Sequence, residues 1–270
     1  MEFRLWTLLA VVVFFLFLQE CIGLRADDDF GKKEGTKMGI GVKFYGFYGV
    51  NRDKSAERVI EELKEAGVNT VFCGTKCRDI EKFRELCRKH GISFFLIIPV
   101  FADKKAVKED KTLMCTTNRG NEGKKPGMSW YIMVKPTRKD YREKKLRQIE
   151  EYVNRLKPDG LSLDFIRFFV YWEGVKPDAK IEEIECGDFS PITLQAFSGD
   201  TGVSIPGELT TPAEIYRWIL QHKRKEWGAW KCRTITGMVQ SIKEAASRIK
   251  PDIMIALHAV PWREKDFSNA

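Results

Sequence analysis

Two hydrophobic periods alternate along the first part of the chain. Residues Gly39–Gly49 alternate apolar and polar side chains as a strand does, and Ser55–Gly67 repeat apolar side chains at helical spacing before a terminal glycine. The pair recurs, with a strand expected over Val68–Gly74 and a helix over Asp79–Gly91. Residues Ile92–Phe101 are so uniformly apolar that both faces of this third strand must be covered, which is typical of a parallel sheet.

The pattern continues into a fourth strand and is then interrupted. A helix over Asp140–Leu156 delivers the chain into a strand over Gly160–Phe165. Residues 171–231 form a long insertion with at least one helix, Pro212–Trp227. Segments of this length in a compact domain are usually functional or disordered, and the aromatic and helix-forming stretches here predict an ordered, mostly helical cap over the mouth of a barrel.

A helix over Ile235–Lys250 and a fifth strand over Asp252–Trp262 complete the pattern. This alternation predicts an α/β fold with a parallel sheet, either open or closed into a TIM-type (β/α) barrel. The polar positions favour the barrel. Ser162 and Asp164 share one face of the fourth strand, and His258 ends one face of the fifth, as expected for a face that points toward the C-terminal mouth where barrel enzymes react.

The barrel is expected to be incomplete. Five strands can be found, whereas closure takes eight strand–helix units. We therefore expect about five of the eight units here, in a fragment of a longer polypeptide that has little stability or activity alone.

The N-terminal segment predicts export. An unbroken apolar run, Leu5–Leu18, follows one arginine and leads through small and neutral residues into an acidic stretch. This pattern indicates a signal peptide cleaved after Gly23 or Ala26, with an uncleaved signal anchor as the alternative. The protein is expected to be secreted or extracytoplasmic, with membrane contact only through this segment. The expected domains are residues 1–26 (signal), 27–37 (linker) and 38–270 (barrel, with 171–231 as its insertion).

Composition narrows the partners and cofactors. Lys and Arg outnumber Asp and Glu by 46 to 38, but they are dispersed among glutamates in helical segments, so no nucleic-acid partner is expected. Cys73, Cys77 and Cys87 are interleaved with apolar positions, which leaves buried thiols and disulfide bridges both open. The chain has only 3 histidines and no zinc-type spacing, so no metal or other cofactor is expected.

Motifs exclude some enzyme classes and carry one resemblance. The chain has no GxGxxG after the first strand, no Walker A sequence and no G-x-S-x-G, so dinucleotide, nucleotide and serine-hydrolase functions lose their main support. The segment SWYIMVKPTRKDYREKKLRQIEEYVNRLKPDGLSLDFIRF (Ser129–Phe168) places an aromatic residue and a proline before a helix, then D-G-x-x-x-D-x-x-R at the end of a strand. This segment resembles the core of the glycosyl-hydrolase-like barrel families of secreted proteins. The similarity covers most of Gly39–Trp262.

The resemblance implies a role for Asp164. In several sugar-cleaving barrels the nucleophile is an aspartate at the end of the fourth strand, and Asp164 matches this position as nucleophile or base. Arg167 is expected to hold Asp164 ionised or to bind a sugar hydroxyl or carboxylate, with a structural salt bridge as the alternative. Chitinase-like barrels have a catalytic glutamate where this chain has Ile166, so a chitinase mechanism is not supported.

The sequence identifies the second carboxyl group that glycosidic cleavage needs less clearly. Glu173, in the loop after the fourth strand, is the candidate proton donor, and Trp172 beside it offers a surface on which a sugar ring can stack. His258 stands where relatives carry an acid at the end of the fifth strand, and it is expected to bind substrate or assist proton transfer, or else to be a core histidine. Four further residues are expected to line the mouth: Trp130, Trp262, Tyr45 and Lys43.

Two classes of function follow. The first is a glycoside hydrolase, or a related polysaccharide lyase, that acts on an extracellular or envelope glycan, and the formal charge of +8 favours an acidic one. The alternative is a non-catalytic carbohydrate-binding envelope protein that keeps the barrel and its aromatic subsites but lacks a competent acid.

Overall fold

The computed structural model describes residues 39–171, 175 and 179–258 of the 270-residue chain. The expected signal segment and three site candidates, Trp172, Glu173 and Trp262, lie outside the described residues. None of the helices in the described ranges is long and apolar enough to cross a membrane.

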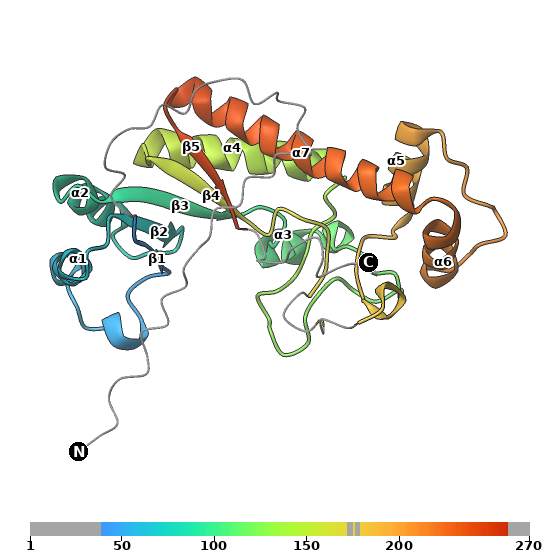
Figure 1. The fold of residues 1–270 in the computed structure, drawn as a ribbon, viewed down its shortest axis with the longest axis horizontal. Coiled ribbons are helices and arrows are strands. Elements are labelled where there is room, and N and C mark those ends of the chain that lie inside the picture. The colour runs from blue at the N-terminus through green and yellow to red at the C-terminus, as the bar shows by residue number, and fades with distance from the viewer. Residues whose placement is uncertain (1–38, 172–174, 176–178, 259–270) are drawn as a thin grey trace, which may run out of the picture. The chain divides into compact units, whose positions relative to one another are not determined.

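Five parallel strands form one sheet in the order β1-β2-β3-β4-β5 (Figure 1). They are β1 (Gly41–Phe44), β2 (Thr70–Gly74), β3 (Ser93–Pro99), β4 (Gly160–Asp164) and β5 (Met254–Leu257). Val71 of β2 stands between Val42 of β1 and Phe94 of β3 in register. The sheet order follows the chain order, which is the arrangement of consecutive right-handed βαβ units, so the α/β fold with a partial TIM-type barrel is confirmed.

The helices fall between the strands as the apolar periods predicted. They are α1 (Ala56–Glu65), α2 (Ile80–Lys89), α3 (Lys104–Glu109), α4 (Lys139–Leu156), α5 (Pro191–Thr201), α6 (Pro212–His222) and α7 (Arg224–Ile249), with short 3-10 turns at η1 (Gly49–Asn51), η2 (Lys111–Leu113) and η4 (Ile181–Glu183). The helix α3 had no counterpart in the sequence prediction, because its six residues are too few to show a period.

The described residues divide into two compact units. Unit 1 takes 39–98, 156–162 and 252–256, and unit 2 takes 99–155, 163–171, 175, 179–251 and 257–258.

Unit 1 holds the first three strands and two packed helices. The helix α1 begins at Ser55, whose hydroxyl accepts a hydrogen bond from the backbone N–H of Arg58 at 3.1 Å. An ion pair between Glu57 and Lys82, at 2.8 Å, joins α1 to α2. Both faces of β3 are covered, as its apolar run predicted, because the neighbouring side chains of Phe94 and Phe95 are both buried.

One face of the sheet carries a buried cluster. Its members are Phe72, Phe95, Ile97 and Ala256. The pleat places Gly160 and Ser162 on this face, and the backbone of Gly160 lies directly against the ring of Phe95.

The cysteines left open by the sequence are thiols. Cys73, Cys77 and Cys87 are buried and unbridged in unit 1, and burial raises the pKa of the Cys87 thiol to about 12. Such thiols behave as small apolar side chains.

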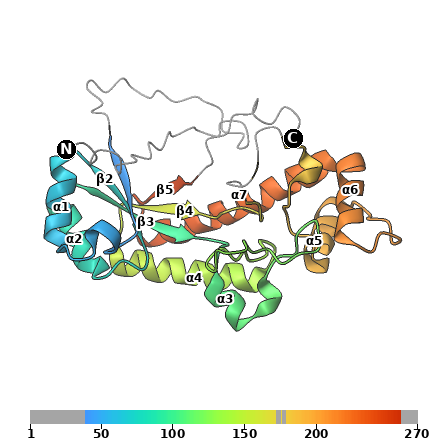
Figure 2. The ribbon, with the colours of Figure 1, turned by 90° about the horizontal axis from the view of Figure 1, so that it is seen from below.

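Unit 2 has an aromatic core at the start of α7. The helices α5 and α6 pack against this part of α7, as Figure 2 also shows. The ring of Trp227 stacks on Trp230 at 5.1 Å, and the ring of Phe197 from α5 meets Trp227 edge-on at 4.9 Å. This core explains why the predicted helix 212–227 was wrong at its end: α6 stops at His222, the non-helical backbone of Lys223 follows, and α7 begins at once so that both tryptophans lie on it.

The helices α4 and α7 run alongside each other (Figure 1). An ion pair between Glu150 of α4 and Arg248 of α7, at 2.9 Å, joins their C-terminal parts. Near the middle of α7, the backbone of Gly237 lies close to the guanidinium of Arg142. Both pairs advance in the same direction, so the two helices are parallel, as in consecutive barrel units.

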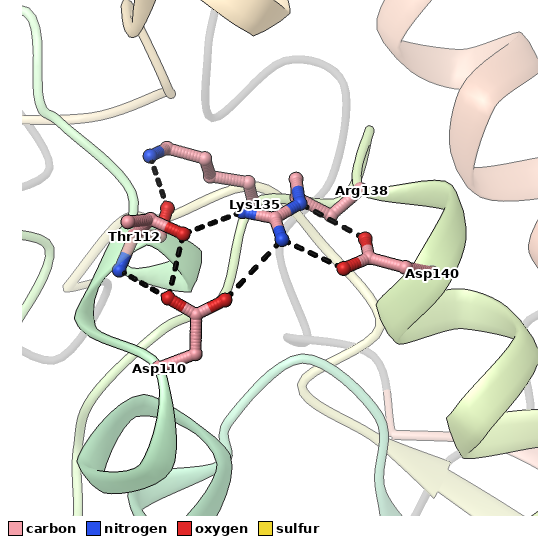
Figure 3. A network of polar contacts seen from close by, with 5 residues as sticks. All are labelled: Asp110, Thr112, Lys135, Arg138 and Asp140. Carbon is pink, nitrogen blue, oxygen red and sulfur yellow. Dashed lines mark hydrogen bonds and ion pairs between the residues drawn. The ribbon is translucent and has the colours of Figure 1, made fainter.

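A polar network anchors the long segment between β3 and α4 (Figure 3). Arg138 donates two hydrogen bonds to Asp140, at 2.9 and 2.7 Å, and one to the hydroxyl of Thr112 at 2.9 Å. Asp110 accepts from the backbone and hydroxyl of Thr112 and from Arg138, and these bonds hold the pKa of its carboxyl below the usual range. Lys135 donates to the carbonyl of Thr112 at 2.6 Å. The network fixes both ends of the loop that carries Trp130.

Asp188 organises the other side of this loop. Its buried carboxylate accepts hydrogen bonds from the backbone N–H of Thr116, at 2.9 Å, and from the hydroxyl of Thr193. Because an ionised carboxylate can only accept, the single proton of Thr193 goes to Asp188, so the hydroxyl of Thr137 is the donor in its 2.7 Å contact with Thr193. Burial raises the pKa of Asp188 despite these donors.

Candidate active site

Asp164 ends β4 and is paired with His258, which follows β5. The Nδ1 atom of His258 lies 3.0 Å from Oδ2 of Asp164, and the other carboxylate oxygen accepts a hydrogen bond of 2.9 Å from the backbone N–H of Phe165. The two strand ends are joined by their backbones, because the N–H of His258 donates to the carbonyl of Leu163 at 2.9 Å. This backbone hydrogen bond therefore places the two side chains next to each other. Both side chains are mostly covered but keep some exposure, 18% for Asp164 and 12% for His258.

The chain turns sharply after Asp164. Phe165 has a φ of +50°, a left-handed conformation that costs a residue with a side chain about 1 kcal/mol or more. The turn brings the backbone N–H of Phe165 to its neighbour's carboxylate. Aromatic contacts hold the ring: Tyr131 meets it edge-on at 5.2 Å and Trp130 at 5.9 Å. Strained backbone held in this way recurs at functional sites, where it presents a group in one geometry.

Arg167 lies on the same aromatic cluster. Its guanidinium carbon is 4.9 Å from the centre of the Phe165 ring, and its Nη2 atom donates to the hydroxyl of Tyr131 at 2.8 Å. The Tyr131 hydroxyl in turn donates to the carbonyl of Val170 at 2.7 Å. Arg167 therefore contacts Tyr131 and Phe165, and its expected role toward Asp164 or a sugar stays a prediction.

The segment between β3 and α4 delivers Trp130 and Tyr131 to the site. Short antiparallel bridges, Met114 with Val134 and Lys124 with Ile132, fold this segment back on itself. Tyr131 is fully buried, whereas Trp130 keeps 54% of its surface exposed next to the buried rings. An exposed indole of this kind is a surface on which a sugar ring can stack.

The structure thus pairs two of the predicted residues, Asp164 and His258, and places two others, Arg167 and Trp130, against the ring of Phe165, the residue that follows Asp164. Lys43 and Tyr45 lie in unit 1, on and just after β1, and both are exposed. Tyr131 and Phe165 were missed, although each is the immediate neighbour of a predicted residue. Within the described ranges, no group of three or more metal-binding side chains lies close enough to hold a metal ion.

The chemistry open to this site is acid–base or nucleophilic. The contacts with His258 and with the backbone N–H of Phe165 fix the orientation of the Asp164 carboxylate. The imidazole of His258 can exchange a proton within one hydrogen bond of that carboxylate. A glycosidase needs both a carboxylate that attacks or activates water and a group that gives a proton to the leaving oxygen.

The comparisons with known proteins support the fold. No protein-family model and no curated protein sequence matches the chain. Among solved structures, the chain is similar to the PgaB (BpsB) glycoside hydrolase domain of Bordetella bronchiseptica, with a TM-score of 0.55 and 15% identity over 80% of this chain and 63% of that one. It is also similar to a polyextremophilic beta-galactosidase of the Antarctic haloarchaeon Halorubrum lacusprofundi, with a TM-score of 0.54 and 16% identity over 82% of this chain and 36% of the enzyme.

An enzyme named for a different activity has a similar fold. Alpha-L-fucosidase isoenzyme 2 of Paenibacillus thiaminolyticus gives a TM-score of 0.52 and 17% identity over 81% of this chain. The chain spans only about a third of the length of the fucosidase and the galactosidase, 32% and 36%. The fold is therefore that of glycoside hydrolase barrel domains.

Proposed function

We propose that this protein hydrolyses a glycosidic bond of an extracellular or envelope polysaccharide, with Asp164 as nucleophile or base. The observation that carries the proposal is the Asp164–His258 pair, with 3.0 Å between its atoms, at the C-terminal ends of adjacent strands in a glycosidase-like sheet. Enzymes with TIM barrels react at this end of the strands. Asp164 would attack the anomeric carbon or take a proton from the attacking water.

His258 would support this chemistry through the proton that it holds. When it donates through Nδ1 to Asp164, its tautomer and ring orientation are fixed. Trp130 would supply a stacking surface for the sugar ring. Glu173, which lies outside the described residues, stays our candidate for the proton donor, with Trp172 and Trp262 as candidate subsites.

The experiment compares Asp164→Asn with wild type on a panel of polysaccharides, measuring both glycan binding and reducing-end release. We expect release to fall by about 10²- to 10⁴-fold while binding is kept. Asp159→Asn is the matched control, since this residue stands at the opposite end of β4 and accepts a hydrogen bond from the backbone of Phe94 at 2.8 Å. The control should keep release. Equal losses in both variants would mean that the aspartate at 164 acts only in folding.

A non-catalytic carbohydrate-binding protein is the second candidate. It is favoured by the described partner of Asp164, which is a histidine. A binder would show saturable glycan binding that depends on Trp130 and no release from any glycan of the panel.

Export is part of the proposal and rests on the sequence of residues 1–26. Intact-mass measurement of protein from the expressing cells should show a chain that begins near Leu24 or Asp27. Recovery of the full-length chain from membranes would indicate a signal anchor.

A further inference from the structure

Two cations lie on the aromatic cluster of the candidate site. Arg167 lies over Phe165 at 4.9 Å, and Nζ of Lys125 is 3.8 Å from the centre of the Tyr171 ring. The Tyr171 and Phe165 rings both pack edge-on against Tyr131, at 5.8 and 5.2 Å. Within the described ranges, neither cation forms an ion pair. Both cations therefore lie on rings that pack against Tyr131.

The guanidinium of Arg167 has hydrogen-bonding capacity left over. One of its five N–H groups donates to Tyr131, and its Nε atom is buried with no hydrogen-bond partner among the described residues. A buried cationic donor without an acceptor is costly, because it loses its water and gains nothing in return. A ligand that brings an acceptor to this guanidinium would recover that cost.

The position of the two cations indicates the chemical class of the ligand. Arg167 is three residues after Asp164 and shares the Phe165 ring with Trp130, whose indole is 54% exposed. A sugar ring that stacks on Trp130 would present its substituents to the guanidinium. A planar carboxylate accepts two parallel hydrogen bonds from a guanidinium, and Lys125 adds a second positive charge.

We propose that the site is specific for an acidic sugar, a hexuronic acid whose carboxylate is held by Arg167 and Lys125. The inference rests on the carbohydrate-directed function proposed above and names its substrate class. In this arrangement Asp164 is paired with His258, and Arg167 and Lys125 supply the positive charge where the uronate carboxylate binds. A neutral sugar would leave the guanidinium unsatisfied, so the surface also discriminates against it.

The experiment measures the binding of galacturonate, glucuronate and mannuronate oligomers by calorimetry, each beside its carboxyl-reduced, neutral counterpart. Wild type should bind at least one uronate oligomer about 10- to 100-fold more tightly than its neutral form. Arg167→Gln should abolish this preference. Lys125→Gln should reduce it and should keep the fold even if the arginine variant does not. The exposed Lys104 is the matched control, since Lys104→Gln removes the same charge outside the cluster and should leave the preference intact.

Two results would overturn the inference: equal affinity for every charged and neutral pair, or equal loss of preference in Lys104→Gln. The outcome is separable from that of the proposed function. Uronate binding without reducing-end release would support the specificity for acidic sugars and refute hydrolysis. Release from neutral glycans with no charge preference would support hydrolysis and refute the specificity.

Discussion

Gly160 is the glycine of the D-G-x-x-x-D segment, and the structure gives it a packing role. A Cβ atom at this position would lie 2.2 Å from Cε1 of Phe95 and 2.5 Å from its Cδ1. The backbone cannot retreat, because the N–H of Asp159 donates to the carbonyl of Phe94 at 2.9 Å and the N–H of Met254 donates to the carbonyl of Asp159 at 3.0 Å. The ring cannot easily move either, since it is buried against Phe72 at 5.2 Å.

We therefore predict that Gly160→Ala lowers the free energy of unfolding by about 1–3 kcal/mol, the range for overpacking a buried site. The matched control is Gly199→Ala. Gly199 is exposed in α5 with no atom within 4 Å of a new Cβ, so the same change should stabilise the protein by about 0.5–1 kcal/mol through helix propensity alone.

Urea unfolding followed by circular dichroism measures the free energy of unfolding of both variants. In thermal unfolding, each kcal/mol of change in that free energy should move the melting temperature by about 2–4 °C. Adding Phe95→Leu to Gly160→Ala should restore part of the loss, since the smaller side chain leaves room for the methyl group. A Gly160→Ala variant as stable as wild type would refute the close contact with Phe95.

Three further predictions concern an arginine, a partly buried aspartate and the cysteines. Arg138→Gln breaks the two hydrogen bonds to Asp140 and should lower the free energy of unfolding by about 1 kcal/mol, read from the urea midpoint. Burial alone would raise the pKa of Asp103, but the charge of Lys145 and the hydrogen bonds from Lys145, Tyr141 and the backbone of Ala106 together lower it. This carboxyl therefore stabilises the fold above about pH 4 and loses that effect as the pH falls through its lowered pKa. Asp103→Asn should flatten that acid limb in unfolding measured from pH 2 to 7, and an unchanged limb would contradict the assignment. Peptide mapping after brief alkylation of the folded protein should find the exposed Cys232 modified and the buried cysteines protected, and the reverse pattern would contradict the burial.

The sequence was sufficient to place the strand ends but not the loops. The alternation of β4 and β5 put Asp164 and His258 on the barrel-facing side of adjacent strands, and their pairing follows once the sheet order is known. No comparable period exists between β3 and α4, where isolated bridges position Tyr131. Its contact with Arg167 joins residues 36 positions apart, and local patterns carry no information about such a pair.

The prediction of one helix through Lys223 was wrong for a related reason. The segment 212–227 has continuous helix-forming residues, so propensity alone predicts one helix through it. The break is set by tertiary packing, since Trp227 and Trp230 are buried together with Phe197 only if a new helix begins before them. Tertiary contacts of this kind override propensity.

The most direct test of the central proposal is the rate of glycosidic bond cleavage by Asp164→Ala, with and without added azide or formate. With a glycan that the wild-type protein cleaves, we predict that the alanine variant loses about 10²- to 10⁴-fold in rate and that a small anion, which can occupy the space of the missing carboxylate, restores part of it. Cleavage by Asp164→Ala at the wild-type rate would contradict the assignment of Asp164, and absence of cleavage by the wild-type protein on every glycan of the panel would contradict the enzyme.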